Sequence, residues 1–403
     1  MNIPETVVHS YRNFFVKTVS RSLQTAYKSI TDTPIVTHDV QDRGLAALEF
    51  APKPQIAPTV WYRAKELFLI LSPKMEQSGR WDEWYPYLEQ GVKMSIAFSD
   101  QRTEGELYLQ IGILWQRRGH FQFAIERFEA AIACAKNVGG SVVWASGLNR
   151  LGFVAKQQHR LEEAVSYAEE ALALIPENHA QRELSYAVLG MVSSCLREYG
   201  KAVHYFQRSL DICEAHGDQY QIAMRLGDLA LALNHQGASQ AAFELIDEAI
   251  IRLKRINAPV DVAINQMNLG IMYGSSGELQ TALEYFAMAK PILEKVSNGF
   301  NLACLYNNQG YCYYKLQQWQ DAERLYKVSL YQWQHLENWH SYANTLDGLG
   351  LVYDKQGRWD DAIRTFKEAL QLLEEKVNKD ECQHLFQEIT ANLEDVYQRS
   401  AHR

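Results

Sequence analysis

The sequence predicts an all-α protein built as a solenoid of about eight helix-turn-helix repeats, with a helical cap at its N-terminal end. The first observation behind this prediction is a period of about forty residues that runs through most of the 403-residue chain. The second is that small and aromatic residues recur at fixed places within each period. The third is that no segment reads convincingly as a strand. A single helix pair cannot bury its apolar stripe, so neighbouring pairs are expected to stack.

Each period is marked by a small anchor residue, which in most copies is a glycine preceded by leucine. Successive anchors stand 38 or 40 residues apart, an alanine follows each anchor after twelve residues, and usually an aromatic residue follows after sixteen. A degenerate first copy has Ser72 as its anchor and Gly79-Arg80-Trp81 as its turn. The seven clear anchors are Gly112, Gly152, Gly190, Ala230, Gly270, Gly310 and Gly350.

Within each repeat the pattern predicts two helices joined by a short turn. The first helix carries apolar residues at helical spacing, as in Ile264, Leu269 and Tyr273, and Gly277 ends it where a left-handed conformation is needed. The second helix passes through the alanine and aromatic positions. Small anchors allow two helix backbones to approach closely, and we expect the aromatic side chain to fill the gap that opens one turn away.

The segment GLGLVYDKQGRWDDAIRTFKEAL, at 348–370, resembles a tetratricopeptide repeat (TPR), and the resemblance extends over roughly residues 58–376. The usual period of that family is about 34 residues. The longer period of this chain, about forty residues, is similar to that of a long-helix TPR subclass found in bacterial signalling proteins. The resemblance implies a right-handed TPR superhelix. Residues 42–51 and 79–81 also resemble the TPR sensor arms of signal-transduction NTPase regulators, although no GxxxxGK[ST] motif is present to hold phosphates.

Three parts are expected along the chain: an N-terminal helical cap and proline-containing linker at 1–57, the eight repeats at 58–376, and a C-terminal capping helix at 377–403. From His9 to Ile30 the apolar residues form one helical face, which must dock, and the first repeat is its expected neighbour. A short helix is predicted around 42–51, followed by prolines that mark a linker. The sequence leaves open whether this segment caps the array or occupies its groove.

Composition limits the functions that the chain can perform. Its formal net charge is −8 and no block of Lys and Arg occurs, which argues against direct binding to nucleic acid or to an anionic membrane. The six cysteines form no CxxC pair, and no apolar run is long enough to span a membrane. A cytoplasmic protein is therefore expected, and self-association remains possible.

Catalytic motifs are not found, so we expect no enzymatic activity, no cofactor and no metal site. The sequence has no HExxH, no GxSxG and no glycine-rich loop after a strand. His335 and His340 flank Trp339, but their spacing places them poorly for a shared metal ion.

Stacked helix pairs form a concave surface lined by the first helices, and in the family that this chain resembles the groove commonly holds a peptide or a partner's helix. A row of Asn carboxamides can hold a peptide main chain, because each can donate and accept one hydrogen bond. An alternative is that these Asn residues serve neighbouring helix ends. Carried over to this chain, the candidate groove residues are Asn149, Arg150, Phe153, Lys156, Asp228, Asn234, Asn268, Asn307, Asn308, Tyr311, Tyr314, Lys315, Asp347 and Lys355.

Aromatic residues are concentrated between 311 and 342 beyond what the repeat requires. Trp319 has counterparts at the same turn position in other repeats and is expected to be structural. Exposed Trp and Tyr side chains are good anchors at protein interfaces. The remaining candidates for such anchors are Tyr311, Tyr314, Trp333 and Trp339.

The sequence therefore predicts a non-enzymatic adaptor or sensor that binds a protein or peptide in its groove, in bacterial signalling or regulation. The alternative is a structural assembly factor that holds a fixed multiprotein complex. A hydrolytic effector would need a catalytic constellation that the sequence lacks.

Overall fold

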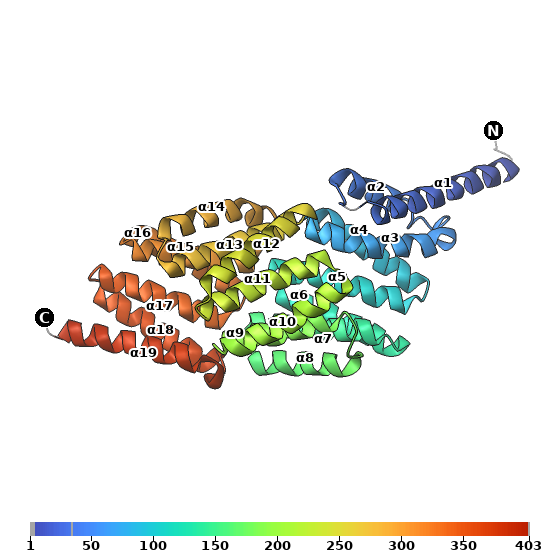
Figure 1. Ribbon diagram of the computed structural model, residues 1–403. Coiled ribbons are helices and arrows are strands. Elements are labelled where there is room, and N and C mark those ends of the chain that lie inside the picture. Colours follow the sequence, from blue (N-terminus) through green and yellow to red (C-terminus); the bar gives the residue numbers. More distant parts are fainter. Residues whose placement is uncertain (1–4, 34, 402–403) are drawn as a thin grey trace.

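The computed structural model describes residues 5–33 and 35–401, and within them the chain forms nineteen α-helices and no strand. The helices stack in sequence order along one coiled ribbon, from α1 at one end to α19 at the other (Figure 1). The all-α class and the solenoid of helix pairs are thereby confirmed.

Eight helix pairs follow the predicted period, and each predicted anchor lies on the first helix of its pair. Successive pairs pack against one another along the whole array. Their bounds are α3 (Ala57–Gln77) with α4 (Trp81–Ala97), α5 (Gln101–Arg118) with α6 (Phe121–Val138), α7 (Ser141–Gln157) with α8 (Leu161–Leu174), α9 (Arg182–Cys195) with α10 (Tyr199–His216), α11 (Gln219–His235) with α12 (Ser239–Arg255), α13 (Pro259–Ser276) with α14 (Leu279–Lys295), α15 (Gly299–Lys315) with α16 (Trp319–His335), and α17 (Trp339–Lys355) with α18 (Trp359–Lys376).

Helices α1 (Glu5–Thr31) and α2 (His38–Leu48) precede the first pair and pack against α3. The apolar face of α1 buries Val19, Leu23 and Ile30, which agrees with the spacing seen in the sequence. Helix α2 begins and ends earlier than the predicted 42–51, and Pro58 lies at the start of α3 rather than in a linker. Helix α19 (Lys379–Ala401) packs on α18 at the other end. The division of the chain into three parts remains a prediction.

Where the residue sixteen positions after an anchor glycine is aromatic, as it is for five of the six anchor glycines, the glycine lies directly beneath its ring. A Cβ atom added to Gly270 would stand 2.6 Å from the ring of Phe286, and one added to Gly350 would stand 2.5 Å from the ring of Phe366. Both rings are fully buried. The aromatic side chain therefore occupies the space above the missing Cβ, so the anchor and its aromatic form one packing unit.

The solenoid also coils back onto itself, which the sequence did not predict. The turn of the first repeat, at Gly79, meets Val260 at the start of the sixth repeat and Val296 at the end of its second helix. The turn of the second repeat, at Gly119, meets Leu336 before the start of the eighth and Phe300 at the start of the seventh. Because each of these turns lies against a repeat five positions further on, one superhelical turn comprises about five repeats and its inner wall is partly enclosed.

We predict that Gly270→Ala destabilises the protein by about 1–3 kcal/mol, because the new methyl group overlaps the Phe286 ring in a close-packed core. The matched control is Gly274→Ala on the same helix. A Cβ there meets Cys312 Sγ at 3.6 Å and Ala282 Cβ at 3.8 Å, both ordinary contacts, and Ala favours helix over Gly by about 0.5–1 kcal/mol. Urea unfolding followed by circular dichroism measures both. Equal effects of the two substitutions would contradict the packing account.

Candidate functional site

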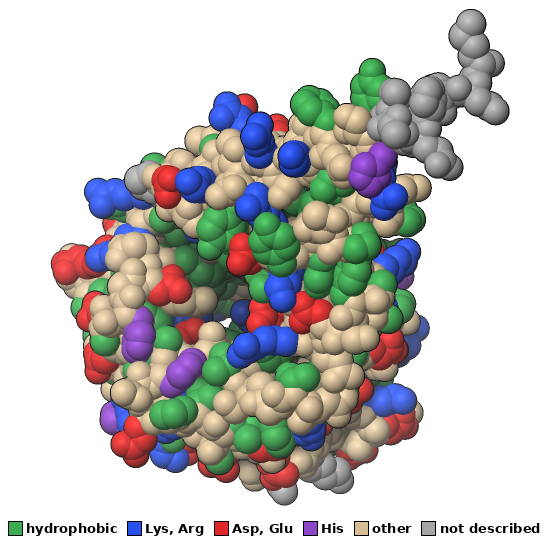
Figure 2. Space-filling model, turned by 90° about the vertical axis from the view of Figure 1, so that its right-hand side faces the viewer, with side chains coloured by type: hydrophobic (Ala, Val, Ile, Leu, Met, Phe, Trp, Pro, Cys, Tyr) green, Lys and Arg blue, Asp and Glu red, His purple; other side chains and the backbone are tan. Residues whose placement is uncertain are grey.

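The inner wall of the coil encloses a cavity of about 680 Å³. It is lined by the C-terminal parts of α3, α5 and α7 and by the N-terminal parts of α9, α11, α13 and α15. Figure 2 looks onto one end of the molecule and shows a central hollow rimmed by acidic and basic side chains. The size falls within the range of about 300–1,000 Å³ that is common for ligand pockets.

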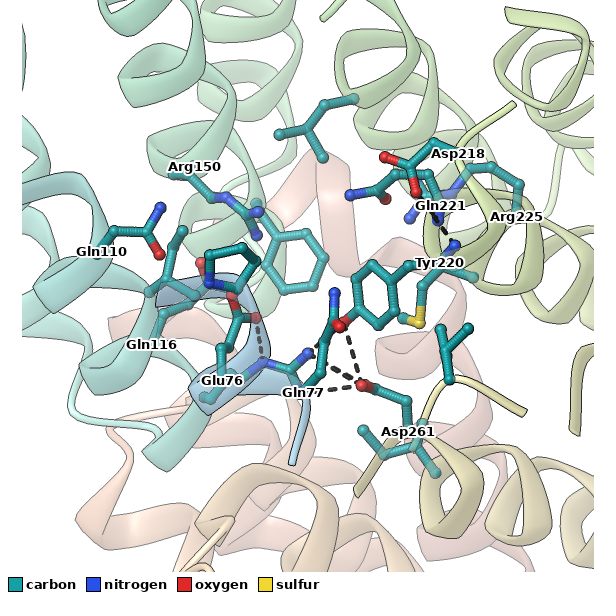
Figure 3. Close-up of a pocket in the computed structure, with 18 of the residues that line it drawn as sticks. Glu76, Gln77, Gln110, Gln116, Arg150, Asp218, Tyr220, Gln221, Arg225 and Asp261 are labelled. Atoms are coloured by element: carbon teal, nitrogen blue, oxygen red, sulfur yellow. Dashed lines mark hydrogen bonds and ion pairs between the residues drawn. The ribbon is translucent and has the colours of Figure 1, made fainter. Parts of the chain in front are cut away.

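Arg117 lines this cavity and joins four helices through a buried ion network, and its partners Glu76, Tyr220 and Asp261 are labelled in Figure 3. Its Nε lies 2.7 Å from Glu76 Oε1, and its Nη1 lies 3.0 Å from Asp261 Oδ1. The hydroxyl of Tyr220 accepts a hydrogen bond from Arg117 and donates one to Asp261, at 2.6 and 3.1 Å. Burial alone lowers the pKa of Arg117, but these neighbours outweigh it and raise that pKa well above its usual value. The network connects the first superhelical turn to the second.

A second charged cluster surrounds Arg225, which is almost completely buried on α11. Its guanidinium lies 3.6 Å from a carboxylate oxygen of Glu183 and 3.4 Å from one of Asp228. Burial raises the pKa of both Glu183 and Asp228, and the nearby Arg225 opposes that rise. Charges of opposite sign are thus matched within the wall.

Arg150, on α7, differs from these two arginines. Its side chain is half-buried and lines the cavity, where it extends toward the interior (Figure 3). It forms no hydrogen bond or ion pair with any residue in the described ranges 5–33 and 35–401. Burial lowers the pKa of its guanidinium, which nevertheless remains a cation at neutral pH.

The candidate groove residues fall into three groups, of which the first lies at the cavity. Arg150 and Phe153 line the cavity, and Asp228 pairs with the cavity residue Arg225. Lys156 lies close enough to Asp228 to lower the pKa of that carboxyl group. The structure therefore brings these four residues of the third and fifth repeats together.

Several other candidates are already hydrogen-bonded within the solenoid. Asn307 accepts a hydrogen bond from Thr345, at 2.9 Å, and Asp347 accepts one from Asn392 of α19, at 2.8 Å. Asn234 bonds to two serines, Ser239 and Ser275. The contacts of these residues agree with the alternative given above, in which such side chains bond neighbouring helices of the solenoid. A role in binding a partner remains a prediction for them.

The remaining candidates lie on the inner wall outside the cavity lining or within the core. Asn149 is fully buried, and neither of its amide atoms has a partner within the described part of the chain. Asn268 is half-buried, and Asn308 donates only to the Cys304 carbonyl of its own helix. Towards the end of the array, Lys315 lies over the rings of Tyr311 and Tyr314, and Lys355 is exposed.

One proposed aromatic anchor is wrong. Trp333 is only 3% exposed and packs edge-on against Phe300, with ring centroids 5.3 Å apart. Its ring packs in the contact between superhelical turns. The residue pattern of a single repeat does not predict that contact. Tyr314 and Trp339 are half-buried, whereas Tyr311 is 39% exposed and remains a candidate.

The most strongly connected cavity residues were missed by sequence reasoning. Glu76 and Arg117 stand four and five residues after their anchors, at the same repeat positions as the candidates Lys156 and Lys315. Tyr220 and Asp261 stand ten and nine residues before theirs, further from the anchor than any of the candidates. They reach the cavity only because the starts of α11 and α13 face the ends of α3 and α5 across the coil.

A stacked histidine pair lies at the contact between the third and eighth repeats. The rings of His159 and His340 are 3.5 Å apart and nearly parallel, at 12°. His159 occupies the left-handed position of its turn, with φ of 61°, and its Nε2 lies 3.0 Å from the carbonyl oxygen of Glu381. Burial, and then His159, lower the pKa of His340 to about 3, and burial lowers the pKa of His159 despite the opposing effect of Glu381. Both rings are therefore neutral at pH 7.

Metal-binding clusters and membrane-spanning helices are both absent from the described residues. No group of three or more His, Cys, Asp or Glu side chains in 5–33 and 35–401 is arranged to hold a metal ion. In the same ranges no helix has both the length and the apolar character needed to cross a membrane.

Two segments of the chain, residues 145–215 and 301–375, match the family model of the tetratricopeptide repeat. They lie within α7–α10 and α15–α18, so these helix pairs are tetratricopeptide repeats. Among curated proteins, the cell division cycle protein 16 homologs of Mus musculus and Homo sapiens are each 28% identical, over 137 and 118 residues. The matched regions cover 33% and 28% of this chain but only 20% and 18% of those proteins. The chain thus spans about a fifth of the length of these relatives.

Solved structures share the fold at low sequence identity. A Rap protein complexed with Competence and Sporulation Factor superposes with a TM-score of 0.52 at 15% identity, covering 85% of this chain and 99% of that one. NprR in complex with its cognate peptide NprX gives 0.51 at 15% identity, covering 72% and 82%. A signal-transduction ATPase with a tetratricopeptide repeat sensor from Pyrococcus horikoshii gives 0.51 at 12% identity, covering 99% and 65%. At such identities the likeness establishes the fold alone.

We predict that Arg117→Met destabilises the protein by about 3–5 kcal/mol, because it leaves the buried carboxylates of Asp261 and Glu76 without their cation. The control is Arg324→Met, which breaks an exposed ion pair with Asp321 and should cost about 0–1 kcal/mol. Urea denaturation at pH 7 measures both values. A loss below 1 kcal/mol for the Arg117 variant would show that the network does not hold the two turns together.

The histidine pair predicts a loss of stability in acid. Because the folded pKa of His340 lies below the unfolded value of about 6.5, the unfolded chain binds more protons, and stability falls as pH falls through 6.5. Between pH 6.5 and 5.0 this single group contributes a loss of about 2 kcal/mol. His340→Phe keeps a ring against His159 but cannot titrate, so its free energy of unfolding should fall about 2 kcal/mol less over that interval. Parallel pH profiles for the two proteins would contradict this assignment.

Proposed function

The chain carries tetratricopeptide repeats within one continuous superhelix, and on this premise we propose that it is a non-enzymatic sensor or adaptor that binds a short peptide, or a peptide segment of a protein, inside the coil. The observation that carries the proposal is the polar cavity of about 680 Å³, to which seven first helices contribute. In a cavity lined by so many repeats, side chains of successive repeats can contact an extended ligand along its length. We further propose a role in bacterial signalling or regulation.

Two structural neighbours support a peptide as the ligand class. The Rap protein was solved with Competence and Sporulation Factor, and NprR was solved with its cognate peptide NprX. Both share the superhelical fold of this chain. The neighbour from Pyrococcus horikoshii carries its repeats as a sensor of an ATPase, which supports a sensing role.

A row of polar residues extends the proposed site beyond the cavity. Gln110, Arg150, Asp228, Asn268 and Asn308 each stand two residues before the anchor of their repeat, and we call them the inner row. Equivalent positions on successive first helices face the same side of a solenoid. Their amide and charged groups are suited to hold the main chain of an extended peptide.

Binding inside the coil offers a way to transmit a signal. The cavity is lined by residues of the first superhelical turn, such as Arg117, and of the second, such as Asp261 and Asn301. A ligand that touches both turns has a higher affinity for the closed coil than for an opened one, so it shifts the population toward the closed form. The ends of the array then move relative to one another.

A second function is favoured by the contacts between superhelical turns. The Arg117 network and the junction at Gly119 and Leu336 hold the coil in one shape, which suits a rigid scaffold for a fixed multiprotein complex. Such an assembly factor would copurify with its partner at constant stoichiometry. A sensor would bind its ligand reversibly and change its radius of gyration.

The test combines peptide selection with solution scattering. Immobilised full-length protein is presented with a library of random pentapeptides, and retained peptides are identified by mass spectrometry. Scattering is then recorded with and without the retained peptides. We expect reversible retention and a smaller radius of gyration on binding. No retention of any peptide, together with an invariant radius, would overturn the sensor proposal and favour the scaffold.

We predict that replacing Asn268 and Asn308 together by Ala weakens peptide retention by about tenfold, the equivalent of one or two lost hydrogen bonds. Helicity and melting should change little, because Asn308 bonds only its own helix and Asn268 bonds no residue within 5–33 and 35–401. The control is Asn137→Ala, an exposed change on the second helix of a pair. Unaltered retention would place the interface elsewhere on the surface.

A further inference from the structure

The three arginines that line the cavity are used differently. Arg117 is saturated by Glu76, Asp261 and Tyr220. Arg225 lies between Glu183 and Asp228. Arg150 has neither a hydrogen bond nor an ion pair to any described residue, although it stands within the same enclosed wall. The guanidinium of Arg150 is therefore available to an acceptor that lies outside the described residues.

The chemistry of this group restricts what it binds. A guanidinium offers five N–H donors and no acceptor, and it stays charged in proteins. Holding it half-buried without a partner is unfavourable, so a ligand that supplies an acceptor gains more here than it would at an exposed arginine. A carboxylate is the best match, since its two oxygens accept two parallel hydrogen bonds from one guanidinium.

Carboxylates of the wall itself are engaged elsewhere. Glu76 and Glu183 act on Arg150 electrostatically, but neither lies within ion-pair distance of it. Glu76 is held 2.7 Å from Arg117, and Glu183 lies beside Arg225 and the hydroxyl of Ser209. Moving either toward Arg150 would strip a buried cation of its partner. No carboxylate of the wall is therefore free to pair with Arg150, and a ligand that brings one would replace water as the acceptor.

Neighbouring side chains add a donor and an apolar surface beside Arg150, and together with it they form a cradle for such a group. Gln110 holds the same repeat position as Arg150 on the adjacent helix α5, and both side chains extend toward the cavity in Figure 3. Its amide adds a neutral donor beside the guanidinium. Phe153, one helical turn after Arg150, also lines the cavity and offers an apolar surface to the rest of a peptide.

We infer that Arg150, assisted by Gln110, anchors a carboxylate of the peptide that the coil binds, either the C-terminal carboxylate or the side chain of an Asp or Glu residue. This inference rests on the proposed function, because it assumes that the ligand is a peptide. It adds the chemical class that the cavity selects and assigns the residue that selects it.

Three pools of N-acetylated pentapeptides test the assignment. The first pool has a free C-terminal carboxylate and no acidic side chain, the second has a C-terminal amide and one Asp or Glu, and the third has a C-terminal amide and no acid. At pH 7 the full-length protein should retain one of the acidic pools at least about tenfold better than the third. The preferred pool identifies the source of the carboxylate.

Substitutions of Arg150 test whether this residue causes the preference for peptides that carry a carboxylate. Arg150→Gln should bring retention of the preferred pool down to that of the third pool, whereas Arg150→Lys should keep part of the preference because it keeps the charge. Arg364→Gln removes an identical charge from a side chain that is 77% exposed on α18, and it should leave the preference unchanged. Circular dichroism verifies that each variant is folded.

Different failures are distinguishable. If the wild-type protein retains all three pools equally, or if Arg150→Gln keeps the acid preference, the assignment of Arg150 is overturned while peptide binding stands. If no pool is retained, both this inference and the proposed peptide function are overturned. Should Arg150→Gln prove unfolded, Arg150→Lys and Gln110→Ala decide the question, since an undiminished preference in both would contradict the cradle.

Discussion

The close contact between the small anchor residue and the side chain that covers it, in most repeats a glycine under an aromatic ring, is the constraint on which the rest of the molecule depends. In Gly270 and Phe286, or Gly350 and Phe366, the ring occupies the space where a side chain would begin, which fixes how closely the two helices of a repeat approach. The same unit returns in five of the eight repeats, and a small residue keeps the anchor position in the others, so successive repeats stack in a similar way. A small difference at each step would accumulate over five repeats, and the first superhelical turn would then miss the second.

Where the turns do meet, the structure uses charge as well as apolar packing. Arg117 reaches from the first turn to the fully buried Asp261 on the second, and Tyr220 closes the network between them. Buried ions of this kind are costly to leave unpaired, so they favour one alignment of the turns over others that would bury similar apolar area. The junction thus defines the shape of the cavity, and the cavity in turn determines which charged groups are left for a ligand.

Sequence reasoning reached the repeats because their rules are local. Anchor, alanine and aromatic lie within sixteen residues of one another, and their spacing alone specifies a helix pair. The contact of His159 with His340 joins residues far apart in the sequence, and its position depends on the summed rotation of five repeats. For the same reason Arg150 was found as a groove residue, whereas Tyr220 and Asp261 were missed and Trp333 was misassigned to the surface. The periodicity predicted the helices that line the cavity but not the contacts between superhelical turns that enclose it.

Each of the early turns contacts a repeat five positions later. The contacts between superhelical turns therefore depend on how many repeats lie between them. In an open array, the loss or duplication of one helix pair merely shortens or lengthens the ribbon. Here, removal of a pair between the second and the sixth would bring different residues opposite Arg117 and would replace Leu336 as the neighbour of Gly119. A change in repeat number between two paired turns therefore alters their contacts, and grafting experiments should preserve the spacing between the paired turns.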